Sequence, residues 1–178
     1  MFLNVRDICL IGMLVAVIVF CAQLSIPFPG GVPFSLQTFG IALAGITLGA
    51  KRGAVAAAVY ILLGAVGVPV FVHFSGGLHH IAGPTGGFIL SFPLIALFAG
   101  LGAKSERVLV RAAWIAGGLG LNYVCGLLFF NFVTGLGLRA GFMVAVLPFL
   151  LFDVVRVGLL VTVGWRVRRA LERSGYLH

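Results

Sequence analysis

The residues best suited to chemistry in this sequence are Asp153 and Arg156, an acid and a base inside a long apolar stretch. The stretch covers residues 141–165 and reads GFMVAVLPFLLFDVVRVGLLVTVGW. A charge at the centre of a bilayer costs several kcal/mol, roughly 2.5–3.5 on insertion scales. Residues three apart share one face of a helix, so the two charges can neutralise each other. Either the pair only fixes helix packing, or it is a polar recognition site inside a membrane bundle.

The chemistry of such a site follows from its two side chains. The Asp153 carboxylate offers hydrogen-bond acceptors and the Arg156 guanidinium offers a fork of donors. A ligand that satisfies both carries N–H donors together with a carbonyl or a carboxylate. It need not be charged, because the protein pair is already neutral. Buried pairings of this kind discriminate sharply, since a wrong ligand leaves polar groups unpaired.

The composition defines the setting of this site. The chain has 178 residues, of which 61% are hydrophobic and only 9% charged, too few charges to cover a soluble domain. The sequence therefore predicts an all-α integral membrane protein. The net charge of +8 would suggest nucleic acid in a soluble protein. Here the basic residues cluster at helix ends, which indicates topology signals and contacts with lipid headgroups, and no nucleic-acid partner.

Hydropathy predicts one membrane domain over residues 1–178 with six spans. They cover about residues 8–26, 35–50, 54–71, 88–103, 112–133 and 141–165. The first apolar run is longer than the core of a cleaved signal peptide, so it is interpreted as a span.

The basic residues predict the orientation. With a cytoplasmic N-terminus, ten of them fall inside: Arg6, Lys51, Arg52, Lys104, Arg107, Arg111, Arg166, Arg168, Arg169 and Arg173. Arg139 falls outside, and Arg156 lies within the bilayer. This bias predicts that both termini are cytoplasmic. The uncharged Pro/Gly-rich loops 26–34 and 73–87 then share the outer side and cap a ligand pocket.

Further polar residues are candidates for that pocket. Gly83 and Thr85 lie in the second loop, whose glycines can expose backbone amides. Gln37 either sits at the membrane interface or lines a cavity. Asn122, next to Tyr123 in the fifth span, should face the bundle interior, where it touches a neighbouring helix or a ligand. Gly12 and Ala16 form a small-residue face on the first span, a candidate helix contact.

Two other function classes remain open. One is a membrane enzyme that uses Asp153 with the loop histidines His73, His79 and His80. Against it, the sequence has no HExxH, nucleophile elbow or P-loop lysine, and no metal or cofactor is expected. The other is a structural subunit without a ligand.

Five motifs, in order along the chain, resemble those of the biotin transporter substrate-binding (BioY) family. They are PFSLQTF (33–39), LGAKRG (48–53), LLGAVGVPVF (62–71), SGGLHHIAGPTGGF (75–88) and LPFLLFDVVR (147–156). The resemblance implies the six-helix substrate-capture subunit of an energy-coupling factor vitamin transporter. Such a subunit binds biotin from outside the cell. A transmembrane coupling subunit and two cytoplasmic ATPases then drive its release inward from the plasma membrane.

The resemblance also implies roles for individual residues. Asp153 matches the family's aspartate and accepts a ureido N–H of biotin. Arg156 stands where the family usually has lysine, and it faces either the ureido oxygen or the carboxylate of biotin. Gly12 and Ala16 match the small-residue face that meets the coupling subunit in the family. One turn further along this face, Phe20 is a large residue where the pattern would continue with a small one.

Overall fold

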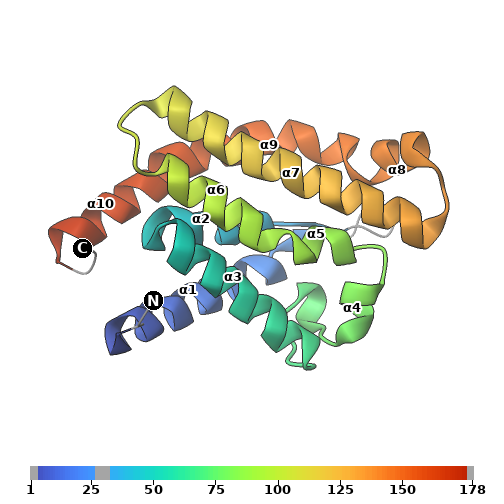
Figure 1. Ribbon diagram of the computed structural model, residues 1–178, viewed down its shortest axis with the longest axis horizontal. Coiled ribbons are helices and arrows are strands. Elements are labelled where there is room, and N and C mark those ends of the chain that lie inside the picture. Colours follow the sequence, from blue (N-terminus) through green and yellow to red (C-terminus); the bar gives the residue numbers. More distant parts are fainter. Residues whose placement is uncertain (1–3, 27–32, 176–178) are drawn as a thin grey trace.

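The structure, a computed structural model, describes residues 4–26 and 33–175 and is built almost entirely of helices (Figure 1). The helices are α1 (Val5–Gln23), α2 (Gln37–Leu48), α3 (Ala50–Ala65), α4 (Leu78–Ala82), α5 (Gly86–Leu90), α6 (Phe92–Gly102), α7 (Val108–Thr134), α8 (Leu138–Ala145), α9 (Leu147–Leu159) and α10 (Trp165–Arg173). A short turn η1 (Val72–Phe74), a π-helical turn η2 (Leu160–Gly164) and the strands β1 (Ser25–Ile26) and β2 (Phe34–Ser35) complete the elements.

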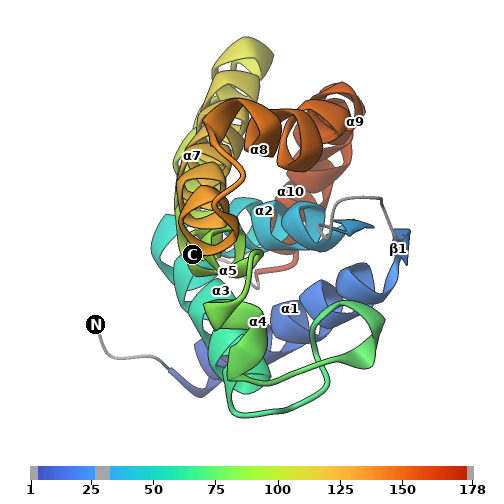
Figure 2. The ribbon, with the colours of Figure 1, turned by 90° about the vertical axis from the view of Figure 1, so that its right-hand side faces the viewer.

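The helices form three layers, which two perpendicular views show in the same order. Helices α7, α8 and α9 form one outer layer, α1, α3 and α4 form the other, and α2 and α5 lie between them (Figures 1 and 2). Helix α6 packs against α2, α3 and α7 and so joins the layers. Its first turn contains Pro93, a position where the missing N–H costs no helical hydrogen bond.

Gly45 marks the closest approach of helices within the bundle. A Cβ at this position would collide with the Ala96 backbone of α6. A Cβ at Gly53 of α3 would lie 2.8 Å from the Gly45 nitrogen, and one at Gly100 of α6 would lie 2.7 Å from the Gly45 oxygen. Small residues therefore allow α2, α3 and α6 to meet backbone to backbone, as is common in membrane bundles.

Among the described residues, three helical segments are long and apolar enough to cross a membrane: Val5–Gln23, Val108–Thr134 and Leu147–Arg173. Two shorter apolar segments, Gln37–Leu48 and Gly86–Gly102, match the second and fourth predicted spans. Helix α3 runs from Ala50 to Ala65, so it begins and ends before the third predicted span, 54–71. Helix α7 begins at Val108, earlier than the fifth predicted span, 112–133.

The sequence predicted one continuous helix for the stretch that carries Asp153 and Arg156, but the structure divides this stretch into two helices. Val146, with φ −128° and ψ −55°, separates α8 from α9. Pro148 lies in the first turn of α9 and has no N–H with which to continue the preceding helix. The break lets α8 fold onto α7 while α9 carries the charged pair.

Both predicted loops contain ordered structure. The flanks of the first loop pair as antiparallel strands, Ser25 with Ser35 and Ile26 with Phe34, while residues 27–32 lie outside the described residues. The second loop contains η1, helix α4 and the start of α5. We call residues 71–85, between α3 and α5, the lid.

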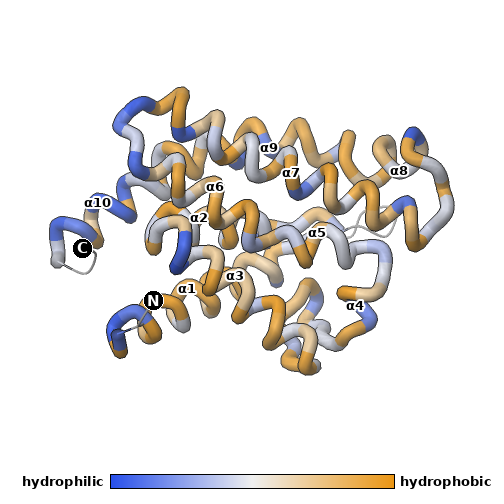
Figure 3. Tube along the Cα trace, in the orientation of Figure 1, coloured by the Kyte–Doolittle hydropathy of each residue, from blue (hydrophilic) through white to orange (hydrophobic). Residues whose placement is uncertain are grey.

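The two ends of the molecule differ in character. Both termini lie at one end, together with the hydrophilic α10, the turn between α6 and α7 and the start of α3 (Figure 3). Helices α4 and α8 lie at the opposite end (Figure 1). The lid is therefore far from the basic termini.

Candidate ligand-binding site

Asp153 and Arg156 lie in the bundle interior and form a hydrogen-bonded group with Tyr123. An Arg156 nitrogen lies 2.5 Å from Asp153 Oδ1, and the Tyr123 hydroxyl donates to Asp153 Oδ2 at 2.5 Å. Both charged residues are buried, with 7% of Asp153 and 6% of Arg156 exposed. Spacing by three residues on α9 explains the ion pair, but Tyr123 comes from α7 and only the packing of the two helices brings it here.

Arg156 also links α9 to the segment between α1 and α2. Its second terminal nitrogen donates to the Ser35 carbonyl of β2 at 3.1 Å. Its guanidinium lies 5.6 Å from the ring centre of Phe34, which in turn stacks on Phe149. These contacts fix the orientation of the planar guanidinium, which a lysine could not reproduce.

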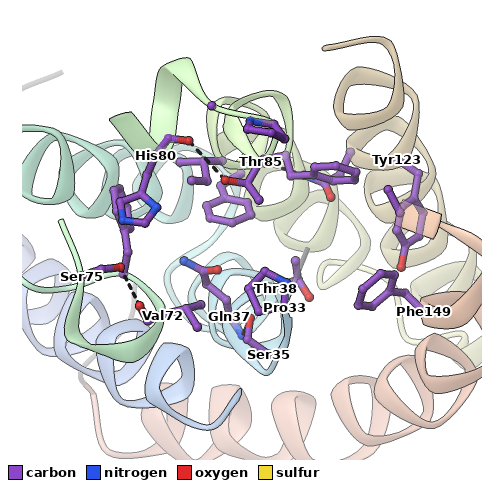
Figure 4. Close-up of a pocket in the computed structure, with 18 of the residues that line it drawn as sticks. Pro33, Ser35, Gln37, Thr38, Val72, Ser75, His80, Thr85, Tyr123 and Phe149 are labelled. Carbon is purple, nitrogen blue, oxygen red and sulfur yellow. Dashed lines mark hydrogen bonds between the residues drawn. The ribbon is translucent and has the colours of Figure 1, made fainter. Parts of the chain in front are cut away.

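A cavity of about 480 Å³ opens beside this group. Its wall combines residues of the β2 segment, α2, the lid and α5 to α9: Pro33, Ser35, Gln37, Thr38, Phe71, Val72, His73, Ser75, His79, His80, Gly83, Pro84, Thr85, Phe88, Ile89, Phe92, Leu119, Asn122, Tyr123, Ala145, Phe149 and Arg156. In Figure 4, His80 and Ser75 stand on one side of the cavity and Tyr123 and Phe149 on the other, with Gln37 and Thr38 between them. The volume and the mixed wall suit a small organic molecule.

The structure gathers most of the residues expected to form the pocket. Gln37, Gly83, Thr85, Asn122, Tyr123 and Arg156 all line the cavity. Asp153 does not belong to the lining and lies behind Tyr123 and Arg156, to which it is bonded. Of this hydrogen-bonded group, the acceptor that lines the wall is the Tyr123 oxygen, because its proton is already directed at Asp153.

Asn122 makes the contact with neighbouring helices that was one of the two alternatives left by the sequence. Its amide nitrogen donates to the Phe88 carbonyl at 2.8 Å and to the Ser91 hydroxyl at 2.7 Å, so it ties α7 to the junction of α5 and α6. It also lines the cavity.

Gln37 lines the cavity and does not sit at an interface with water, since only 8% of it is exposed. Its amide donates to the Tyr60 hydroxyl at 2.5 Å, which donates to the Val70 carbonyl at 3.0 Å. This chain of hydrogen bonds links α2 through α3 to the start of the lid.

The lid itself is strained and is held by Gln23 of α1. His73 and Phe74 have φ of 57° and 53°, a left-handed conformation that residues with a Cβ rarely adopt. The Gln23 amide oxygen accepts from the Phe74 N–H at 2.8 Å, and its nitrogen donates to the Phe71 carbonyl at 3.0 Å. Strained backbone of this kind persists only where its surroundings hold it.

Replacing Gln23 with alanine should release the lid. Loss of both hydrogen bonds, each worth about 1 kcal/mol, should raise amide exchange across residues 71–77 by about tenfold or more, with little change elsewhere. Hydrogen–deuterium exchange of the detergent-solubilised protein measures this. Gln23→Glu is the matched control: it keeps the acceptor for Phe74 but loses the donor to Phe71, so its effect should be intermediate. Unchanged exchange in Gln23→Ala would contradict the role of this clamp.

Sequence reasoning missed part of the wall. Phe149 and Ser35 carried no signal of their own, because apolar and small residues are ordinary in a membrane protein. His73, His79 and His80 were noted, but only as candidates for the alternative of a membrane enzyme. The structure describes residues 4–26 and 33–175, and in that part of the chain no three His, Cys, Asp or Glu side chains are grouped as metal ligands.

The chain matches the profile of the BioY family over residues 1–173. This chain belongs to the BioY family. "Probable biotin transporter BioY" of Pyrococcus horikoshii is 38% identical over 167 residues, covering 93% of this chain and 98% of that protein. "Biotin transporter BioY" of Thermotoga maritima is 38% identical over 165 residues, covering 92% and 96%.

The fold also matches a solved structure. The crystal structure of the S-component for biotin from an ECF-type ABC transporter superposes with a TM-score of 0.84 over 93% of this chain and 92% of that chain. At 24% sequence identity, this similarity shows the fold. The predicted family and all-α membrane class of this BioY protein are thus confirmed.

Proposed function

We propose that this BioY protein captures biotin from outside the cell and delivers it inward together with an ATP-driven coupling complex. The observation that carries the proposal is the cavity of about 480 Å³, which has the Tyr123–Arg156 wall backed by Asp153, in a chain of a family of biotin transporters. A transport role without chemistry of its own accords with relatives that are named as transporters.

The site suits the two polar parts of biotin. The ureido ring carries two N–H donors and one carbonyl, and the valerate tail ends in a carboxylate. We assign a ureido N–H to the acceptor group formed by Asp153 and the Tyr123 oxygen that it orients. Arg156 donates to an oxygen of the ligand. The apolar parts of biotin lie against Phe88, Phe149 and their neighbours, while Gln37, Asn122, Gly83 and Thr85 complete the polar contacts.

The proposed topology is a single domain of six spans in the plasma membrane with both termini in the cytoplasm. Two features support it. The basic and hydrophilic segments gather at the end that carries both termini (Figure 3), as expected for a cytoplasmic side. The lid lies at the opposite end, where it would meet biotin arriving from outside.

We further propose that α1 docks the transmembrane coupling subunit, which works with two ATPase subunits. Gly12 and Ala16 both lie on the exposed face of this helix, and a Cβ at Gly12 would meet no described atom within 4 Å. Small residues on a membrane-facing helix allow a second helix to approach closely.

Gly12→Val should therefore separate binding from transport. Biotin binding to the purified protein should stay within about twofold of the wild type, while uptake by cells that also express the coupling complex should fall by about tenfold or more. The parallel measurements are labelled-biotin binding and cellular uptake. Phe20→Leu is the control and should retain uptake, because position 20 lies on the same exposed face but already holds a large side chain. Normal uptake with Gly12→Val would remove this face from the docking site.

Binding of labelled biotin to the detergent-purified protein tests the main proposal. Saturable binding that unlabelled biotin displaces is the expected result. Absence of binding in correctly folded protein would refute the proposal. Stoichiometric metal in the purified protein would favour the alternative of a membrane enzyme.

A further inference from the structure

The lid brings three of the four histidines of the chain to the cavity wall. His73 comes from η1, and His79 and His80 come from α4. In Figure 4 the His80 side chain lies across the cavity from Tyr123 and Phe149. Tyr123 is linked through Asp153 to Arg156, so we call that side the Arg156 end of the wall. The cavity is therefore polar at two opposite ends.

No acidic side chain of the protein is available to the histidine end. The sequence contains four acidic residues, and each lies within 4 Å of an arginine. The pairs are Asp7 with Arg52, Glu106 with Arg169, Asp153 with Arg156, and Glu172 with Arg168. A carboxylate beside the lid histidines must accordingly come from a bound molecule.

His80 is the lid histidine with an unsatisfied atom. Its Nε2 is buried and has no hydrogen-bond partner among the described residues. Its ring packs edge-on against Phe71, with centres 5.6 Å apart, and lies 4.1 Å from the ring of His79. A buried polar atom without a partner is rare in a protein and calls for an explanation, such as a ligand.

The groups around His80 are neutral or basic. Its own helix contributes His79, and η1 contributes His73. The facing helix α3 contributes Tyr60, whose hydroxyl is occupied by Val70 and Gln37, and α5 contributes no titratable group. Burial and the neighbouring His79 lower the pKa of His80, so its imidazole is neutral near pH 7 in the free protein.

We infer that His80 binds the carboxylate of the ligand, at the end of the cavity opposite Arg156, and gains a proton as it does so. The inference rests on the proposed function and deepens it. A carboxylate beside an imidazole stabilises the imidazolium and gives the orphaned ring nitrogen an acceptor. Arg156 then faces the ureido carbonyl. Of the two partners that the sequence left open for Arg156, the ureido oxygen and the carboxylate, this arrangement selects the ureido oxygen.

This arrangement predicts the sign of a pH effect. Binding raises the pKa of His80 from its lowered value in the free protein. Between those two pKa values the complex holds one proton more than the free protein, so affinity increases as the pH falls, by up to tenfold per pH unit. The ligand carboxyl group titrates near about pH 4.3, below this range, and stays ionised.

The experiment compares biotin with biotin amide, which lacks the negative charge, between pH 6 and pH 8. Wild-type protein should bind biotin more tightly at pH 6 than at pH 8 and should bind the amide about tenfold or more weakly, without pH dependence. Calorimetry in two buffers of different ionisation enthalpy should detect proton uptake with biotin only. His80→Asn should lose the pH dependence, the proton uptake and most of the preference for biotin.

Leu78→Asn is the matched control, since Leu78 is exposed on the same helix and does not line the cavity. It should keep the preference for biotin and the proton uptake. If Leu78→Asn abolishes both while His80→Asn does not, the assignment to His80 is wrong. If wild-type protein binds biotin and its amide equally at every pH, the inference fails while the proposed function stands. If wild-type protein binds no biotin, the proposed function itself fails. Should His80→Asn not fold, the wild-type comparisons alone decide.

Discussion

Asparagine in place of Asp153 should weaken biotin binding by about tenfold to a hundredfold. Asp153 accepts a hydrogen bond from Tyr123 and forms an ion pair with Arg156. These two partners form the polar wall at the Arg156 end of the cavity. A neutral amide accepts less strongly than a carboxylate, and it can also turn an N–H toward the Tyr123 oxygen. Hydrogen bonds to charged groups are worth about 1.5–3 kcal/mol, which corresponds to this loss. Equilibrium binding of labelled biotin measures it.

The same substitution should destabilise the fold, because Arg156 would stay buried without a counter-ion. Breaking a buried pair costs about 3–5 kcal/mol, whereas replacing both partners with apolar residues is often nearly neutral. The double variant Asp153→Leu, Arg156→Met should therefore regain thermal stability but not biotin binding. Wild-type affinity in the double variant would show that the pair only fixes packing, the structural alternative.

Tyr123→Phe separates the two acceptors in this group. It removes the hydroxyl that lines the cavity but leaves the Asp153–Arg156 pair intact. Weaker binding at unchanged stability supports Tyr123 as the acceptor on the wall. Unchanged binding would point to direct contact between the ligand and Asp153.

Valine in place of Gly45 should destabilise the bundle strongly. Its Cβ would collide with the backbone of α6, which cannot move aside as a side chain can. Overpacking costs about 1–3 kcal/mol even where side chains can adjust. A loss of about 3 kcal/mol corresponds to a melting temperature lower by about 6–12 °C for a chain of this size. Thermal unfolding in detergent, followed by tryptophan fluorescence, measures it.

Gly12→Val is the matched control for Gly45→Val, since it makes the same change on the open face of α1. It should leave the melting temperature within about 2 °C of the wild type. A similar loss in both variants would mean that the effect comes from helix propensity and not from the contact of α2, α3 and α6.

The sequence alone determined the class of the protein, and it pointed to several of the residues that line the cavity. Hydropathy and charge are local properties, so they identify apolar segments and the uneven distribution of basic residues without a structure. An ionised pair inside an apolar stretch is conspicuous for the same reason. The five motifs then pointed to the BioY family, which the family profile confirms.

Only the tertiary structure decided how the site is assembled. It brought Tyr123 of α7 to Asp153 of α9 and thereby moved the acceptor on the cavity wall from the carboxylate to the phenol oxygen. It broke the expected helix at Val146, and it placed His80 of the lid across the cavity from Tyr123 and Phe149. The site depends on contacts between residues far apart in the sequence, such as Tyr123 with Asp153, where the separation is 30. Hydropathy reports whether a residue is buried, but the choice of its partner is set by helix packing, which local sequence does not encode.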